Sequence, residues 1–284
     1  MNTCSLERLE AALQVLQTTD PSPTSHPRFE LHHFDCLPST SQTLWELIEA
    51  GAPPGTVVIA AEQSAGRGQW GRQWQSNRGG LYLSVDWQPP TSIAESHLLT
   101  VCSGWGIAIA LQERGIPVRL KWPNDLVLGD RKLGGILTQT RIRAGKIDRA
   151  VIGVGINWDN PVPETGINLR SFWQASPERG NSPTISSIEM LGAIVLYGLT
   201  RGMQYPQHQG IDSLVSAYEA LLVNLGQSVA IEGNSGTVVG VDRSGNLKIR
   251  LTSDTGDTQL EIIRSPGTIS LGYSNGENGE RIKN

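Results

Sequence analysis

Apolar residues recur with helical spacing in several parts of the chain. Leucines stand three and four residues apart within residues 1–19, which predicts a short amphipathic helix there; they are Leu6, Leu9, Leu13 and Leu16. Ser39 and Gln42 have the spacing of a capping box and Gly51 is a typical stop, so a second helix is expected between them. Further helices are predicted at about 95–113, 185–202 and 211–225.

Strand patterns lie between these helices. Residues 81–87 place apolar side chains on one face and polar ones on the other, as a half-buried strand does. Other strands are expected at 56–62, 118–122, 126–128, 133–142 and 150–158. Gly129-Asp130 and Ala144-Gly145 have the composition of hairpin turns. Together these elements predict an α+β fold, a mixed β-sheet with helices packed on one side.

The pattern changes at residue 226. Five short strands are expected at 228–233, 236–242, 247–252, 258–263 and 267–271, separated by tight Gly, Asn and Asp turns. This predicts a small C-terminal all-β barrel of the Src-homology type. We therefore divide the chain into a helix and linker (1–28), a catalytic domain (29–225), the barrel (226–272) and a loose tail (273–284).

Composition narrows the classes of function. Apolar residues are 38% of the 284-residue chain, which permits a buried core, and no run of 18 apolar residues predicts a membrane span. The start of the chain lacks the layout of a secretory signal, and the three scattered cysteines indicate a reducing, cytoplasmic location. A net charge of −4 argues against general nucleic-acid binding. The sequence contains neither a CxxC nor an HExxH motif, so a zinc site is not expected.

A glycine- and arginine-rich segment, Gly66-Arg-Gly-Gln-Trp-Gly-Arg-Gln-Trp74, follows a predicted strand. Its glycines free backbone N–H groups for close approach to a ligand, and Arg67 and Arg72 suit carboxylate or phosphate. Residues 60–80 carry a charge of +2 in an acidic protein. The ordinary alternative is a surface loop with solvated arginines. The segment is neither a Walker loop nor a Rossmann turn, since no GK[ST] follows and the next element is a strand.

Three further segments combine polar groups with strand glycines. Lys121-Trp-Pro-Asn-Asp125 is followed by Lys132-Leu-Gly-Gly-Ile136, and residues 119–132 again carry +2. Gly153-Val-Gly-Ile-Asn157 ends a strand, where alternating glycines invite a ligand to the backbone. Ser39-Thr40-Ser41 opens a helix. Each of these segments also has an ordinary structural explanation. The Lys121–Ile136 segment could be a hairpin with surface lysines, the Gly153–Asn157 segment a tight sheet crossing, and Ser39–Ser41 a helix cap.

In their order along the chain, from Ser39-Thr40-Ser41 to Gly153–Asn157 and then the small barrel, the four motifs resemble the biotin protein ligases, in a form without a DNA-binding repressor domain, and the match runs from about Phe34 to Leu271. The resemblance implies a fold similar to class II synthetases. It also implies a two-step reaction: biotin and ATP form biotinyl-5′-AMP and diphosphate, and a lysine of a biotin carboxyl carrier protein, as in acetyl-CoA carboxylase, then takes the biotinyl group. Mg²⁺ is expected with ATP, with ligands that the sequence does not identify, and no tightly bound prosthetic group is implied.

The family pattern implies a role for each matching residue. Lys132, Arg67 and Asp125 are the catalytic candidates: Lys132 contacts the carboxylate and α-phosphate, Arg67 covers the biotin carboxylate, and Asp125 orients or deprotonates the acceptor lysine. The candidates for binding biotin are Ser39, Thr40, Gln63, Arg67, Lys132, Gly135 and Gly153. The candidates for binding ATP and the adenylate are Arg72, Trp74, Lys121, Asn124 and Asn157.

Two departures from the family pattern carry expectations. The family loop commonly reads GRGRxGR, and here Gln69 stands at the fourth position, so one cation near the acyl phosphate is lost. Residues 1–35 carry a charge of −3 and are too few for a helix-turn-helix reader, so no repressor function is expected.

The rival functions differ in chemistry. A lipoate ligase would act on another acid, and a biotin sensor would bind without releasing diphosphate. A nucleic-acid-binding barrel would need a basic surface, whereas residues 230–284 hold seven acids and six bases. No membrane or nucleic-acid partner is therefore expected, and the protein is expected to be a monomer or a homodimer.

Overall fold

A seven-stranded mixed sheet carries the predicted motifs. The computed structural model describes residues 4–19, 27–89, 96–175, 185–231, 234–251, 260–269, 271–274 and 281–282. The strands of this sheet are β1 (Glu30–Phe34), β2 (Thr56–Ala60), β3 (Leu81–Trp87), β4 (Arg119–Lys121), β5 (Asp125–Leu128), β6 (Arg131–Arg143) and β7 (Lys146–Ile156). Their order is β1-β2-β3-β7-β6-β5-β4. β1 and β2 are parallel and the other neighbours are antiparallel.

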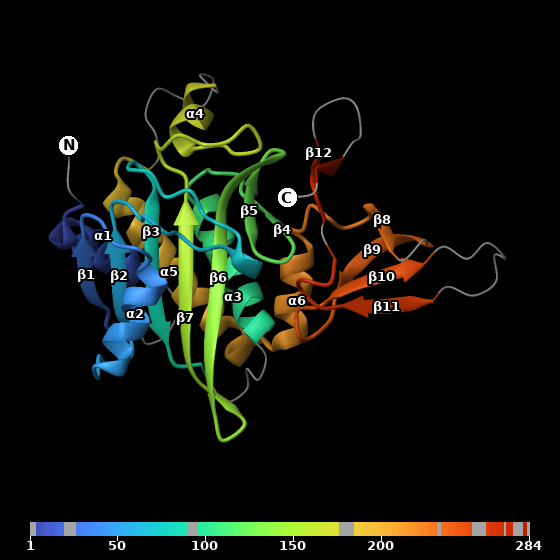
Figure 1. Ribbon diagram of the computed structural model, residues 1–284, viewed down its shortest axis with the longest axis horizontal. Coiled ribbons are helices and arrows are strands. Elements are labelled where there is room, and N and C mark those ends of the chain that lie inside the picture. Colours follow the sequence, from blue (N-terminus) through green and yellow to red (C-terminus); the bar gives the residue numbers. More distant parts are fainter. Residues whose placement is uncertain are drawn as a thin grey trace.

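Most of the helices pack behind this sheet (Figure 1). They are α1 (Leu6–Thr19), α3 (Ser96–Gln112), α5 (Ile188–Gln209) and α6 (Ile211–Glu219), with the short α4 (Leu169–Gln174) near one end of the sheet. The helix α2 (Thr40–Glu49) differs. Alternate residues of β2 separate into two cores, because Val57 packs with the helices behind the sheet and Val58 packs with α2. The helix that opens with the Ser-Thr motif therefore lies on the opposite face.

The C-terminal region is a separate antiparallel sheet with the order β11-β10-β9-β8. Its strands are β8 (Ser228–Ile231), β9 (Asn234–Val241), β10 (Leu247–Leu251) and β11 (Glu261–Arg264). A short pair, β12 (Tyr273–Ser274) with β13 (Arg281–Ile282), follows. Trp122 joins the two sheets, because its indole Nε1 donates to the Gly245 carbonyl at 2.9 Å and its backbone N–H donates to Asn224 Oδ1 at 2.8 Å.

The mixed sheet, its packed helices and the all-β C-terminal region are confirmed, and several details differ. A strand at residues 30–34 and the helix α4 were not predicted. The last predicted helix ends at Glu219, because the Leu221 carbonyl accepts from the Leu120 N–H and the Val223 N–H donates to the Leu120 carbonyl, so the chain pairs with β4. The fifth strand expected over 267–271 is not formed in its described residues, which turn instead.

Two smaller expectations are also corrected. Ser39 occupies the N-cap position of α2, but its side chain makes no capping hydrogen bond, so the prediction of a capping box is wrong. The expected loose tail begins with the paired strand β12, in which Tyr273 is buried. Residues 20–26 of the expected linker and 275–280 and 283–284 of the expected tail lie outside the described residues. Within the part of the chain that is described, no helix is long and apolar enough to cross a membrane.

Candidate active site

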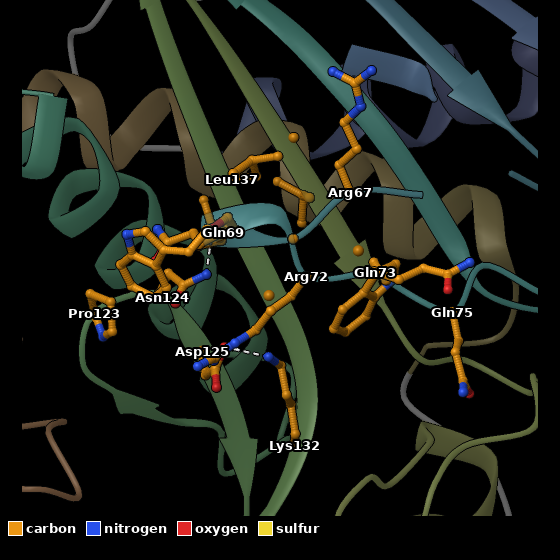
Figure 2. A pocket seen from close by; sticks show the side chains of 18 of the residues that line it. Arg67, Gln69, Arg72, Gln73, Gln75, Pro123, Asn124, Asp125, Lys132 and Leu137 are labelled. Atoms are coloured by element: carbon orange, nitrogen blue, oxygen red, sulfur yellow. Dashed lines mark hydrogen bonds and ion pairs between the residues drawn. The ribbon is translucent and has the colours of Figure 1, made fainter. Parts of the chain in front are cut away.

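A cavity of about 680 Å³ is lined by the Gly-Arg segment, the first parts of β5 and β6, the last part of β7, the start of α2 and the C-terminal residues 267–269 and 271–273. Figure 2 shows part of this cavity, with Arg72, Asn124, Asp125 and Lys132 drawn close together. All the predicted site residues line it: Ser39, Thr40, Gln63, Arg67, Arg72, Trp74, Lys121, Asn124, Asp125, Lys132, Gly135, Gly153 and Asn157. Segments that are far apart in the sequence therefore meet in one place.

A hydrogen-bonded network of hydroxyl and amide groups forms the wall of the cavity beside α2. Gln63 Oε1 accepts from the Thr40 backbone N–H at 2.8 Å, and Gln63 Nε2 donates to Ser76 Oγ at 2.7 Å. Thr40 Oγ1 lies 2.8 Å from Ser84 Oγ, which lies 2.9 Å from Ser41 Oγ. These groups hold one another in place, so this end presents a fixed set of donors and acceptors to a neutral polar ligand. Sequence reasoning missed Ser84 and Ser76, which stand behind the predicted residues.

The Gly-Arg segment forms a tight turn across the cavity. The Gly68 N–H donates to the Arg72 carbonyl at 2.7 Å, and a short 3-10 turn, η1 (Gln69–Gly71), lies between them. Arg67 Nη2 donates to Gln42 Oε1 at 3.0 Å. In Figure 2 the Arg67 guanidinium points away from Asp125 and Lys132, whereas Arg72 extends toward them. In this arrangement Arg72 is the arginine of the segment directed at the charged centre.

The Trp74 indole packs against the sheet at two strand glycines. A Cβ atom at Gly155 would lie 2.5 Å from Trp74 Nε1, and one at Gly135 would lie 3.5 Å from the ring. The Trp74 Nε1 atom is buried and has no hydrogen-bond partner among the described residues. Lys132 Nζ is 5.2 Å from the centre of the ring. Gly135 and Gly155 thus leave space for a flat aromatic surface next to the charged centre. Gly155 was not among the predicted site residues.

The charged centre is built around Asp125. Lys132 Nζ lies 2.6 Å from Asp125 Oδ1, and the Tyr273 hydroxyl donates to Asp125 Oδ2 at 2.7 Å. Lys121 Nζ sits 3.2 Å from the centre of the Tyr273 ring. Burial, and secondarily the Asp125 charge, raise the pKa of Tyr273 well above its usual value, so its hydroxyl remains a donor. Sequence reasoning missed Tyr273; its signal was an aromatic residue directly after the last apolar run.

The two predicted asparagines already have protein partners. Asn124 Nδ2 donates to the Ile136 carbonyl at 2.8 Å. Asn157 Nδ2 donates to the Ile167 carbonyl at 3.2 Å, and Asn157 Oδ1 accepts from Asn160 at 2.9 Å. Both side chains therefore fix loops around the cavity.

The cavity is strongly positive. Among the described residues that line it, four are cationic (Arg67, Arg72, Lys121 and Lys132) and one, Asp125, is a carboxylate. An excess of positive charge in a concave site favours anionic ligands such as carboxylates and phosphates. No group of three or more His, Cys, Asp or Glu side chains in the described ranges is arranged to hold a metal ion.

Comparison with known proteins first gives the class. Residues 33–157 match the Biotin/lipoate A/B protein ligase family, and these residues contain all four motifs.

The relatives then give the branch of that class. The chain is 30% identical over 227 residues to the bifunctional ligase/repressor BirA of Bacillus subtilis, covering 76% of this chain and 68% of the relative. A biotin-bound point mutant of the Aquifex aeolicus biotin protein ligase is similar in structure, with a TM-score of 0.65, 26% identity and coverage of 86% and 99% of the two chains. The complex of that ligase with biotin and ATP has a TM-score of 0.64 at 24% identity, covering 83% and 98%. The chain belongs to the biotin protein ligase family.

Proposed function

We propose that this chain activates biotin with ATP and transfers it to a lysine of a biotin carboxyl carrier protein, such as the biotin-accepting domain of acetyl-CoA carboxylase. The observation that carries the proposal is the single cavity in which the four motifs meet. It has a polar end, an aromatic surface formed by Trp74 over strand glycines, and a cationic centre. The family membership supports the same reaction, as does the similar Aquifex aeolicus structure described in complex with biotin and ATP.

In the first step a carboxylate oxygen of biotin attacks the α-phosphorus of ATP. A new P–O bond forms, the bond from the α-phosphorus to the bridging oxygen breaks, and diphosphate leaves. Both reactants are anionic, so they must be held together by fixed cations. Lys132 and Arg72 are directed at the charged centre around Asp125. Arg67 would bind the biotin carboxylate after its hydrogen bond to Gln42 breaks. Holding both reactants in line supplies much of the acceleration.

The polar network is the proposed biotin end of the cavity. A ureido ring is neutral and polar, so its burial needs matched hydrogen-bond partners. Ser39, Thr40 and Gln63 supply side-chain groups, and all three line the cavity. Gly135 and Gly153 also line the cavity, and a Cβ atom at Gly153 would lie 2.8 Å from Ser41 Oγ, so this glycine lets the hydroxyl network lie against the strand.

The opposite end is the proposed nucleotide site. Trp74 offers a flat surface, and Arg72 and Lys121 offer charge for the phosphates. Asn124 and Asn157 would act by holding the surrounding loops, since their amides are bonded to protein groups. Mg²⁺ would accompany ATP and screen its phosphates. Asp125 is the one carboxylate among the described lining residues, which fits an ion held mainly by phosphate oxygens and water.

In the second step the amine of the carrier lysine attacks the acyl carbon of the adenylate. The new C–N bond forms, the bond from the acyl carbon to the phosphate oxygen breaks, and AMP leaves. The amine must lose a proton, and Asp125 is the nearest candidate acceptor in the cationic centre. Lys132 would stabilise the charge on the departing phosphate.

The remaining properties follow the same proposal. The three cysteines, Cys4, Cys36 and Cys102, are all free thiols, which fits a reducing, cytoplasmic compartment. The ligase would act as a monomer or a homodimer, with the carrier as its protein partner and with no nucleic-acid or membrane partner.

The test incubates the full chain with labelled biotin, ATP, Mg²⁺ and a carrier domain. We expect label to appear on the carrier only when all components are present, and not on a carrier whose acceptor lysine is changed to arginine. A parallel reaction with lipoate and its own carrier should give no label. Labelling by lipoate in preference to biotin would contradict the proposal, as would biotin binding without release of diphosphate.

A further inference from the structure

Tyr273 bridges both ends of the Lys121–Asp125 motif from the far end of the chain. It is 8% exposed, its hydroxyl lies 2.7 Å from Asp125 Oδ2, and its ring centre lies 3.2 Å from Lys121 Nζ. An ammonium at that distance from an aromatic face is a close cation–π contact. One side chain thus sets the position of two charged groups in the cavity.

The hydroxyl contact divides the two oxygens of Asp125 between different partners. Oδ2 accepts from Tyr273, and Oδ1 faces the Lys132 ammonium at 2.6 Å. The Asp125 side chain is 13% exposed, so few water molecules can substitute for either partner. When Lys132 turns to an anionic substrate, the Tyr273 hydroxyl is the contact that still fixes the carboxylate plane.

The segment that carries Tyr273 also touches the Gly-Arg segment. A Cβ atom at Gly267 would lie 2.4 Å from Trp70 Nε1, so the indole packs directly on this glycine. Gly267, Thr268, Ile269, Leu271 and Gly272 line the cavity together with Tyr273. The C-terminal segment is therefore a wall of the site, in contact with two of its motifs.

We propose that Tyr273 is a positioning residue of the ligase reaction: it holds Asp125 Oδ2 so that Oδ1, which is buried against the Lys132 ammonium, takes the proton of the carrier amine in the second step, when Lys132 turns to the substrate. This inference rests on the proposed function. The proton moves from the attacking nitrogen to Oδ1 as the C–N bond forms and AMP departs. The phenol proton stays on Tyr273 throughout. Its ring separately holds Lys121 for the nucleotide.

The test measures the two steps separately in the full chain. Adenylate formation is followed by biotin-dependent exchange of diphosphate with ATP, and transfer is followed from preformed adenylate to the carrier domain. Tyr273→Phe removes the hydroxyl and keeps the ring, so we expect transfer to slow about tenfold while adenylate formation stays within about twofold. Tyr273→Leu also removes the ring, and should raise the KM for ATP roughly threefold.

The controls separate positioning from a general loss of structure. Tyr82→Phe makes the same chemical change at a buried tyrosine whose hydroxyl donates to the Asn77 carbonyl, and should leave both steps unchanged. In an Asp125→Asn background, Tyr273→Phe should change transfer by less than about twofold, because the group it positions has been replaced.

The outcomes distinguish this inference from the function beneath it. A wild-type chain that labels no carrier overturns the proposed function. A wild-type chain that labels the carrier while Tyr273→Phe transfers at the wild-type rate overturns the positioning role alone. Equal slowing by Tyr273→Phe with and without Asp125→Asn overturns it too, since the effect would not pass through that carboxylate.

Discussion

At the scale of single residues, the Lys132–Asp125 ion pair is the contact whose loss we expect to affect the proposed first step most. Lys132→Ala removes a cation that we propose faces the reacting anions, and leaves the largely buried Asp125 carboxylate without its charged partner. We expect biotin-dependent diphosphate exchange to fall on the order of 100-fold. Lys248→Ala is the matched control, since it removes a lysine of β10 whose Nζ lies 3.9 Å from Glu219 Oε1. Comparable exchange by both variants would contradict the role of Lys132.

Gln69 stands where the family pattern commonly has an arginine. Its Oε1 atom is buried and has no hydrogen-bond partner among the described residues. Gln69→Arg adds a cation beside the acyl phosphate, so we expect release of the adenylate to slow about tenfold. A single-turnover reaction, quenched at intervals after dilution, measures that release. Gln174→Arg, on the exposed side of α4, adds the same charge elsewhere; an equal rate of release from both variants would oppose the prediction.

Gly155 decides where the Trp74 indole lies. An alanine Cβ would come within 2.5 Å of Trp74 Nε1 and displace the ring from the sheet. We expect Gly155→Ala to weaken ATP binding at least about tenfold in equilibrium titration, with a small change in melting temperature. Gly104→Ala provides the control, since the nearest atom to its Cβ is 3.5 Å away. Unchanged ATP affinity in Gly155→Ala would show that the indole surface is not used.

At the scale of elements, β1 shows how burial produces a pH dependence. His33 Nε2 is buried without a hydrogen-bond partner in the described structure. Burial lowers the pKa of His33 below its ordinary 6.5, against the opposing charge of Asp35. The unfolded chain therefore binds a proton more readily than the folded one, and stability is lost as pH falls through 6.5 toward the folded pKa.

Chemical denaturation at about pH 7.5 and about pH 5.5 tests this expectation. The wild type should be less stable at the lower pH, and His33→Gln should reduce that difference by removing the titrating group. His32→Gln, on the neighbouring residue that pairs with Glu30, should keep the wild-type difference. An undiminished fall in the His33→Gln variant would assign the effect to other groups.

The elements that sequence reasoning found and missed differ in a physical way. Strands such as β3 and helices such as α1 carry a clear hydrophobic period, so their own residues predict them. The strand β1 reads Glu-Leu-His-His-Phe, in which two half-buried histidines hide the apolar pattern. The end of α6 is set by backbone pairing with Leu120, a tertiary contact that no local pattern contains.

At the scale of the whole molecule, the site is assembled from segments that only the fold brings together. The motif residues could be predicted because each carries a recognisable chemical pattern and the motifs occur in a known order. Ser84 and Tyr273 could not, since each matters through a neighbour distant in sequence, and Gly155 was noted only as a strand glycine because its contact with Trp74 is also distant in sequence. The C-terminal region, expected as an appended domain, contacts the site in two places: its four-stranded sheet bonds Trp122, and Tyr273 of β12 bonds Asp125.

The central claim is that one cavity joins the carboxylate of biotin to the α-phosphate of ATP. The most direct measurement is native mass spectrometry of the full chain after incubation with biotin, ATP and Mg²⁺ and without any carrier. We predict a complex carrying one biotinyl-5′-AMP for each chain, with an equal amount of diphosphate released. A chain that holds unreacted biotin, or consumes no ATP, would contradict the claim.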